Sequence, residues 1–268
     1  MLKLLANVYP VLFRTDLAVQ FQYRAAMVIW LIGLVIQPVI YLVVWLAVTE
    51  ARDGQVGDFT SADFAAYYIT YMVVNHLTFT WFMFEFEYRV RSGSFSPLLL
   101  QPLHPIHRDI ASNLSYKLLT MLLVIPVAVL LIWFFEPRAE INQWSIAMSI
   151  PSIIMAFFLR FFFEWALALA AFWTTRVAAI NQFYFALQLF LAGRMAPLDL
   201  TPEWVQQLAY ASPFPWMVAF PVDVILGKLT FSQCLEGLQF QFFWTIISLG
   251  VMAVVWKRGI RAYSAVGS

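Results

Sequence analysis

The chain has 268 residues, of which 62% are hydrophobic and only 12% are charged, and its formal net charge is +1. This charge excludes a broadly basic nucleic-acid binder, so no nucleic-acid partner is expected. The single cysteine, Cys234, excludes a disulfide framework and a thiolate metal cluster. Because the apolar residues form long continuous runs, the composition indicates an all-α membrane protein without room for a soluble domain.

The N-terminal segment differs from a signal peptide. Pro10, Arg14 and Asp16 interrupt its apolar stretch, and no Ala-x-Ala cleavage site follows. Lys3 and Arg14 fall near one face of a helix, which makes the segment moderately amphipathic. We therefore predict that residues 1–24 form a helix in the membrane interface.

Six later stretches are apolar enough to predict transmembrane helices, and all but the fifth reach the roughly 20 residues that a membrane crossing needs. The fifth extends toward Pro197. The six predicted spans are Ala25–Val48, Phe64–Phe84, Tyr116–Phe135, Ser145–Trp173, Ile180–Leu191 and Leu238–Trp256.

The distribution of basic residues predicts the orientation of these spans. Cytoplasmic connections carry an excess of Lys and Arg. One alternating set of connections holds 11 of the 16 basic residues, whereas the opposite set holds Arg52, Arg138, Arg194 and Lys228. Both termini are therefore predicted to be cytoplasmic. The basic-rich set comprises Lys3, Arg14, Arg24, Arg89, Arg91, Arg108, Lys117, Arg176, Lys257, Arg258 and Arg261.

The connection before the last span, residues 194–237, is long and unusually apolar. Pro213, Pro215 and Pro221 break its apolar stretch repeatedly, so a continuous spanning helix is not expected there. We predict a re-entrant helical hairpin that dips into the outer leaflet. The alternative is an ordinary amphipathic surface loop.

One cytoplasmic connection, residues 85–115, is large enough to recognise a partner. After a mixed-charge helical end, Gly93 permits a break, and Ser94 or Ser96 is predicted to cap a short apolar helix over Pro97–Leu100. Such a helix can insert its leucines into a groove on another protein. The alternative is a plain loop whose leucines lie against lipid head groups.

Two charges fall inside the fourth predicted span. Arg160 and Glu164 are four residues apart and so share one helical face. They are interpreted either as a structural ion pair or as part of a polar path or subunit interface. His76 in the second span is expected to be a hydrogen-bonded packing residue. At the inner end of that span, Glu85 is predicted to pair with Lys117.

Several motifs resemble those of type-2 ABC exporter permeases. They are Glu87-x-Arg89-x-Arg91-x-Gly93, Pro97-Leu-Leu-Leu-Gln-Pro-Leu103, Pro202-x-Trp204, Pro213-Phe-Pro-Trp-Met-Val-Ala-Phe-Pro221 and Trp256-x-x-Gly259-x-x-x-Tyr263. The resemblance covers essentially all of residues 1–268 and implies a single permease domain. It further implies that Leu2–Gln22 lies beside an ATPase and that Ser94–Gln101 contains a coupling helix. The implied coupling residues are Glu87, Arg89, Arg91, Gly93, Pro97, Leu98, Leu99, Leu100 and Arg108.

By this resemblance, the chain is expected to be the non-catalytic membrane subunit of an ATP-driven exporter in a bacterial plasma (inner) membrane. Its expected partners are membrane lipid, cytoplasmic ABC ATPase subunits and a second permease, either identical or different. ATP and Mg would bind the ATPase, because Gly227-Lys228-Leu229 lacks the rest of a phosphate-binding loop and no cofactor is expected here. The alternatives are an intramembrane enzyme using His76, Glu85 or Glu164, and an ion-coupled secondary transporter.

Overall fold

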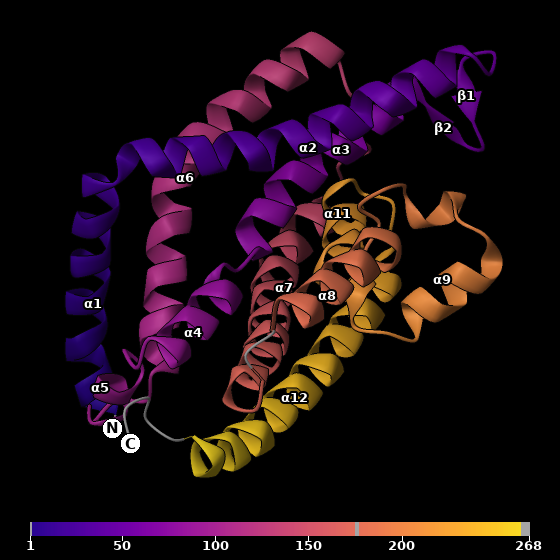
Figure 1. Cartoon of the computed structure of the whole chain (residues 1–268). Helices are drawn as coiled ribbons and strands as arrows, with labels where there is room; N and C mark the ends of the chain where they lie inside the picture. Colours follow the sequence, from indigo (N-terminus) through magenta and orange to yellow (C-terminus); the bar gives the residue numbers. More distant parts are fainter. Residues whose placement is uncertain (1, 175–176, 264–268) are drawn as a thin grey trace.

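The computed structural model describes residues 2–174 and 177–263, and it is built almost entirely from helices (Figure 1). Arg176, which was counted above as a cytoplasmic charge, lies outside these residues. The elements are α1 (Leu2–Gln22), α2 (Arg24–Glu50), β1 (Gln55–Val56), β2 (Phe59–Thr60), α3 (Ser61–Thr78), α4 (Phe82–Arg91), α5 (Ser96–Leu99), α6 (Ile106–Phe135), α7 (Gln143–Ala168), η1 (Leu169–Phe172), α8 (Val177–Leu191), η2 (Leu198–Leu200), α9 (Glu203–Tyr210), α10 (Phe214–Met217), α11 (Ala219–Ile225) and α12 (Phe231–Ala262).

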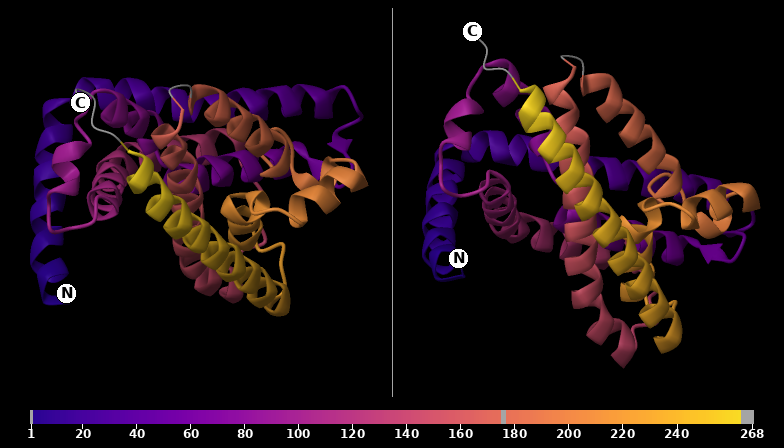
Figure 2. Two further views of the ribbon diagram at one scale, coloured as in Figure 1. Left: turned by 60° about the horizontal axis from the view of Figure 1, so that its bottom comes forward. Right: turned by 90° about the horizontal axis from the view of Figure 1, so that it is seen from below.

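The N-terminal helix α1 covers the predicted range and lies along one edge of the molecule in all three views (Figures 1 and 2). It packs against α6. Gln20 Nε2 donates a hydrogen bond to the carbonyl of Ser112 at 3.4 Å, and the Tyr9 hydroxyl lies 2.9 Å from His107 Nδ1. These contacts attach α1 to the start of α6. Its position in a membrane interface stays a prediction.

The second predicted span is interrupted. Helix α3 ends at Thr78 and α4 begins at Phe82, so residues 79–81 are not helical. Helix α3 starts with a capping box in which Thr60 and Asp63 bond reciprocally. A small antiparallel hairpin, β1–β2, precedes it and was not predicted from the sequence.

Helices α7 and α12 lie side by side and form the largest helix pair of the fold (Figure 2). Capping boxes at Asn142 and Thr230 start these two helices. Helix α12 therefore begins at Phe231, seven residues before the predicted span, because the cap lies upstream of the most hydrophobic stretch. The short 3₁₀ helix η1 continues α7.

Residues 194–237 contain four short helical elements, η2, α9, α10 and α11, before α12 begins. Residues 213–222 are buried against the rest of the chain. Helix α9 instead exposes the apolar side chains of Trp204 and Leu208. The segment is therefore a compact helical assembly, and its depth in a membrane stays a prediction.

Among the described residues, four helical stretches are long and apolar enough to cross a membrane: Arg24–Glu50, Ile106–Phe135, Gln143–Phe172 and Phe231–Ala262. The prediction of six spans is not confirmed by the length and hydropathy of the helices. The second predicted span is broken, and the fifth corresponds to α8, which has 15 residues. The chain is nevertheless a multi-pass, all-α membrane protein.

Candidate functional site

The turn between α4 and α5 is closed by hydrogen bonds to one carbonyl. Gly93 has a φ of +75°, a left-handed conformation that favours glycine. The Phe95 amide and the Ser94 hydroxyl both donate to the carbonyl of Arg89, at 3.0 and 3.4 Å. The prediction that Ser94 or Ser96 caps the short helix is wrong, because α5 has no side-chain cap and Ser94 is bonded elsewhere.

Phe95 anchors α5 to the ends of α7 and α12. Its ring is fully buried, with ring centroids 5.0 Å from Phe86, 5.6 Å from Phe172 and 5.7 Å from Tyr263. The contacts with Phe172 and Tyr263 are edge to face, and such contacts stabilise a packed arrangement beyond simple burial. A displacement of α5 must therefore disturb α7 and α12. We call the following residues the aromatic cluster: Phe86, Phe95, Trp165, Phe172, Trp256 and Tyr263.

Gly259 allows α12 to approach this cluster closely. A Cβ atom at position 259 would lie 2.2 Å from Cδ2 of Phe172, so the ring would have to move. Ser96 adds a polar contact, because its hydroxyl lies 2.8 Å from the hydroxyl of Tyr263. The glycine and tyrosine of the C-terminal motif thus have structural roles at the predicted coupling segment.

The three leucines of this segment have different environments. Leu98 is buried, with 8% of its surface exposed, and Leu99 packs partly against the core. Leu100 is 89% exposed. Pro97, at the start of α5, is also exposed. A partner can therefore contact Leu100 directly, whereas Leu98 belongs to the internal packing of this chain.

Arg89 joins α4 to α6 through two ion pairs. Its guanidinium lies 2.7 Å from Glu85 Oε1 and 2.7 Å from Asp109 Oδ1. Asp109 is only 1% exposed and also accepts a hydrogen bond from Trp165 Nε1 at 3.0 Å. The predicted pairing of Glu85 with Lys117 is wrong: the carboxylate turns to Arg89, one helical turn away, while Lys117 is buried and bonds a backbone carbonyl.

The remaining charges of the predicted coupling set lie nearer the surface. Glu87 and Arg91 form a 3.5 Å ion pair in which Arg91 is 64% exposed. Arg108 is exposed at the first turn of α6. On α1, burial raises the pKa of Asp16, while Arg108 acts in the opposite direction. The surface near the start of α6 therefore combines exposed basic groups with partly buried acidic groups.

His104 lies against the aromatic cluster rather than in open solvent. Its ring centroid is 4.3 Å from that of Trp256 and 5.7 Å from that of Trp165. Burial, followed by the charge of His107, lowers the pKa of His104. Across the described residues, no group of three or more His, Cys, Asp and Glu side chains is placed to hold a metal ion.

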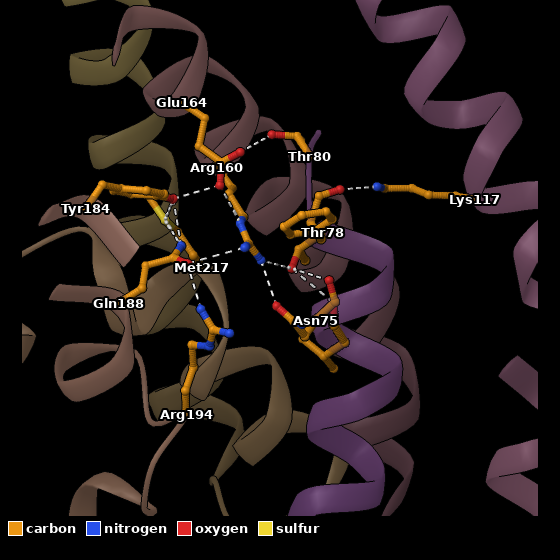
Figure 3. Close-up of polar contacts among 12 residues, drawn as sticks. Asn75, Thr78, Thr80, Lys117, Arg160, Glu164, Tyr184, Gln188, Arg194 and Met217 are labelled. Atoms are coloured by element: carbon orange, nitrogen blue, oxygen red, sulfur yellow. Dashed lines mark hydrogen bonds and ion pairs between the residues drawn. The ribbon is translucent and has the colours of Figure 1, made fainter. Parts of the chain in front are cut away.

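Arg160 and Glu164 form a buried ion pair with several further hydrogen-bond partners (Figure 3). Arg160 Nε lies 2.8 Å from Glu164 Oε1, and both side chains are at most 1% exposed. Arg160 also donates to Asn75 Oδ1 at 2.9 Å and to Thr78 Oγ1 at 3.2 Å. Tyr184 donates to Glu164 at 2.8 Å. The pair thus joins α3, α7 and α8, and removing one member would leave an uncompensated buried charge.

The break between α3 and α4 is held by side chains from two other helices. Thr80 donates a hydrogen bond to Glu164, and Lys117 donates one to the carbonyl of Phe79 (Figure 3). The guanidinium of Arg160 also lies 5.2 Å from the centroid of the Phe79 ring. These contacts satisfy backbone and side-chain groups that an interrupted helix would otherwise leave unpaired.

Arg194, three residues after the end of α8, extends the polar contacts toward α2. Its guanidinium donates to Tyr71 Oη at 2.9 Å and to Gln37 Oε1 at 3.0 Å. It also lies 3.5 Å from Gln188 Oε1, which accepts from Arg160 at 3.3 Å (Figure 3). Two guanidinium groups therefore converge on one neutral amide oxygen.

His76 is a packing residue, since Nε2 lies 2.8 Å from the hydroxyl of Thr120 on α6.

Sequence reasoning missed the roles of Thr80, Lys117, Gln188 and Arg194. Gln188 carried a usable signal, because a polar side chain within an apolar helix is expected to face protein. The position of Thr80 carried none, since the helix break was not predicted.

A cavity of about 620 Å³ opens between α2, α3, α4, α6 and α8. One helical face of α2 lines it with Trp30, Gly33, Gln37 and Tyr41. Arg194 also lines the cavity, which places the polar groups near α8 next to an aromatic wall. A volume in the range of about 300–1,000 Å³ is typical of small-molecule sites.

These features define a multi-pass helical membrane protein with buried charges inside a bundle of apolar helices. A family model described as ABC-2 family transporter protein matches residues 34–267. The chain belongs to this family, and it is an ABC transporter permease. No curated protein and no solved structure matches the chain.

Proposed function

We propose that the chain is the membrane subunit of an ATP-driven exporter in a bacterial inner membrane. It would form the translocation path with a second permease and couple to separate cytoplasmic ATPase subunits, which hold ATP and Mg. The family assignment supports an ABC permease. Export, the particular partners and the direction of coupling are the parts proposed here.

The observation that carries this proposal is the contrast between Phe95 and Leu100, the residues that flank α5. Leu100 offers an apolar side chain that is 89% exposed, whereas Phe95, five residues earlier, is fully buried in the aromatic cluster. An exposed apolar group on a braced segment suits docking into a groove of another protein. Because Phe95 is packed against the ends of α7 and α12, a displacement of Leu100 by the ATPase would also move these two helices.

A second route leads from α5 into the bundle through α4. Arg89 ties α4 to α6, and the non-helical residues 79–81 lie at the other end of α4. Glu164 and Lys117 hold these residues. Interrupted helices absorb changes in backbone angle, so α4 is proposed to pivot at this break when the ATPase moves α5.

Six crossings and a re-entrant outer hairpin are also proposed. The β1–β2 hairpin and α9 lie toward the right of Figure 1, and α5 lies toward its lower left, which suits alternating crossings with cytoplasmic termini.

Asp58 and Ser94 are both exposed. A cysteine at Asp58 should react with an impermeant thiol reagent from outside, and one at Ser94 should react only after permeabilisation. The native Cys234 is buried and should give a low background. The reverse labelling pattern would overturn the orientation.

The function is tested by purifying the tagged chain from its native membrane and measuring the ATPase that accompanies it. Leu100→Asp should reduce the recovered ATPase at least about tenfold, because the proposed apolar contact with the ATPase is replaced by a charge. The matched control is Leu208→Asp, since Leu208 is also an exposed leucine but lies on α9. This control should retain the ATPase.

Equal ATPase recovery from both variants would refute docking through α5. If the wild-type chain purifies without any ATPase, and the Ser94→Cys variant captures none after thiol crosslinking, the intramembrane-enzyme and secondary-transporter alternatives become the better explanations. The presence of a second, different permease in the same preparation would distinguish a heterodimer from a homodimer.

A further inference from the structure

The cavity between α2 and α8 combines an aromatic wall with an arginine, Arg194, at one end. Trp30 and Trp81 form part of the wall, and their ring centroids are 4.6 Å apart. Phe79 and Phe185 also line it. Trp30 is 57% exposed and Trp81 is 43% exposed, so the cavity opens at the apolar surface of the chain. A hydrocarbon chain can therefore reach it from the membrane.

Arg194 differs from the other charged residues that line this cavity. Glu85 and Asp109 are both paired with Arg89. Within the described part of the chain, no carboxylate oxygen lies within 4.0 Å of the Arg194 guanidinium, whose hydrogen-bond partners are neutral. Arg194 is thus a cation that faces a cavity without a counter-ion.

The region around Arg194 also has a surplus of positive charge. Arg160 shares Gln188 Oε1 with Arg194. Against these two guanidinium groups, the described contacts include one carboxylate, that of Glu164, and it is paired with Arg160. Burying unpaired charge inside a membrane domain is costly, so an anion from outside the chain would be bound favourably here.

We propose that this cavity binds a membrane amphiphile with an anionic headgroup. The headgroup lies against Arg194 and Gln37, and the hydrocarbon part lies along Trp30 and Trp81. The proposal rests on the transport role proposed above and specifies the chemical class of its substrate. The ion pairs at the opposite end, around Arg89, favour this orientation because two carboxylates there share one guanidinium and would repel an anion.

Gly33 offers a way to fill the cavity without disturbing the fold. It lines the cavity, and a Cβ atom built on it meets no other group within 4 Å. Gly33→Met should therefore place a flexible side chain into the space that the ligand needs. Gly250 also has no group within 4 Å of a built Cβ but does not line the cavity, so Gly250→Met is the matched control.

The test compares two probes that share one acyl chain, oleoyl lysophosphatidate and the neutral monooleoylglycerol. Equilibrium binding is measured on the complex purified in a mild non-ionic detergent. The wild type should prefer lysophosphatidate about tenfold or more, and Arg194→Gln should abolish this preference. Arg52→Gln, which removes an exposed arginine outside the cavity, should keep it. Gly33→Met should weaken binding of both probes about tenfold, and Gly250→Met should not.

An unchanged preference in Arg194→Gln would overturn the assignment of the headgroup site. Full-strength binding in Gly33→Met would overturn the cavity itself, even if Arg194→Gln proved unstable. If inorganic phosphate displaces lysophosphatidate at equal concentration, the site recognises a soluble anion and the amphiphile proposal fails. If the wild-type chain binds lysophosphatidate but purifies without an ATPase, the result counts against the transport role alone. If it purifies with the ATPase but does not bind lysophosphatidate, the result counts against the ligand alone.

Discussion

The hydroxyl of Ser96 lies 2.8 Å from the phenolic oxygen of Tyr263, although the two residues are 167 positions apart in the chain. This contact joins the start of α5 to the residue that follows α12. The rings of Phe95 and Tyr263 meet edge to face beside it, with centroids 5.7 Å apart. The predicted coupling segment is thus bound to the end of the last long helix by one polar and one aromatic contact.

Removing this hydrogen bond should loosen α5. Ser96→Ala and Tyr263→Phe should each cost about 0.5–1.5 kcal/mol, and the double variant should cost no more than either, because all three lose one interaction. Hydrogen exchange of the amides in residues 94–101 measures the effect. Tyr210→Phe, on α9, is a control that should leave these amides unchanged. Additive losses would show that the two hydroxyls do not interact.

Adding a methyl group at Gly259 should disturb the aromatic cluster. Gly259→Ala places a Cβ atom 2.2 Å from the Phe172 ring, and such overpacking costs about 1–3 kcal/mol. The thermal midpoint measured by tryptophan fluorescence should fall. Gly250→Ala, also on α12, should leave it unchanged or raise it, because alanine favours a helix and the site is open. Similar midpoints for both variants would argue against close packing at Gly259.

Neutralising one member of the buried ion pair should be worse than neutralising both. Glu164→Gln leaves Arg160 without its carboxylate, and breaking a buried pair on one side costs about 3–5 kcal/mol. The double variant Arg160→Gln, Glu164→Gln should recover part of this loss, since no charge remains unpaired. Detergent thermal stability and the yield of assembled complex are the measurements. A double variant less stable than Glu164→Gln would contradict this account.

Asp223 on α11 should make stability depend on pH. Burial raises its pKa from 3.8 to about 7, although Lys228, with Nζ 3.8 Å from Oδ1, acts in the opposite direction. Because the folded state holds the proton more tightly, this contribution is full below pH 3.8 and is lost as the pH rises through 7. The stability of the wild type should therefore rise between pH 8 and pH 5.5, by up to about 1.4 kcal/mol per pH unit within the window.

The check is a comparison of thermal midpoints at these two pH values. Asp223→Asn should show a smaller rise on acidification than the wild type, because its side chain does not titrate. Asp58→Asn, which changes an exposed carboxylate in the hairpin before α3, should behave like the wild type. An equal pH response in Asp223→Asn and the wild type would exclude Asp223 as the source.

Local sequence patterns predicted much of the fold. The boundaries of α1 follow from the charged residues around an apolar stretch, and the extents of α2 and α7 follow from hydropathy. Helix α6 ends at Phe135 as predicted but begins at Ile106, ten residues before the predicted span, because residues 106–115 are too polar for hydropathy to include them. The spacing of Arg160 and Glu164 placed them on one face. The break at residues 79–81 was not predicted, because Phe-Thr-Trp contains neither glycine nor proline and is apolar enough to continue a helix.

The amino-acid order alone was sufficient for the membrane class, the long helices and the loop that carries Leu100, because hydropathy, charge and helical periodicity are local properties. The three-dimensional packing was needed to separate buried Leu98 from exposed Leu100 and to turn Glu85 to Arg89 instead of Lys117. It also brought Arg194 to the cavity and to Gln188. These features depend on contacts between distant segments, and the distances between such segments are set by the way the helices pack together.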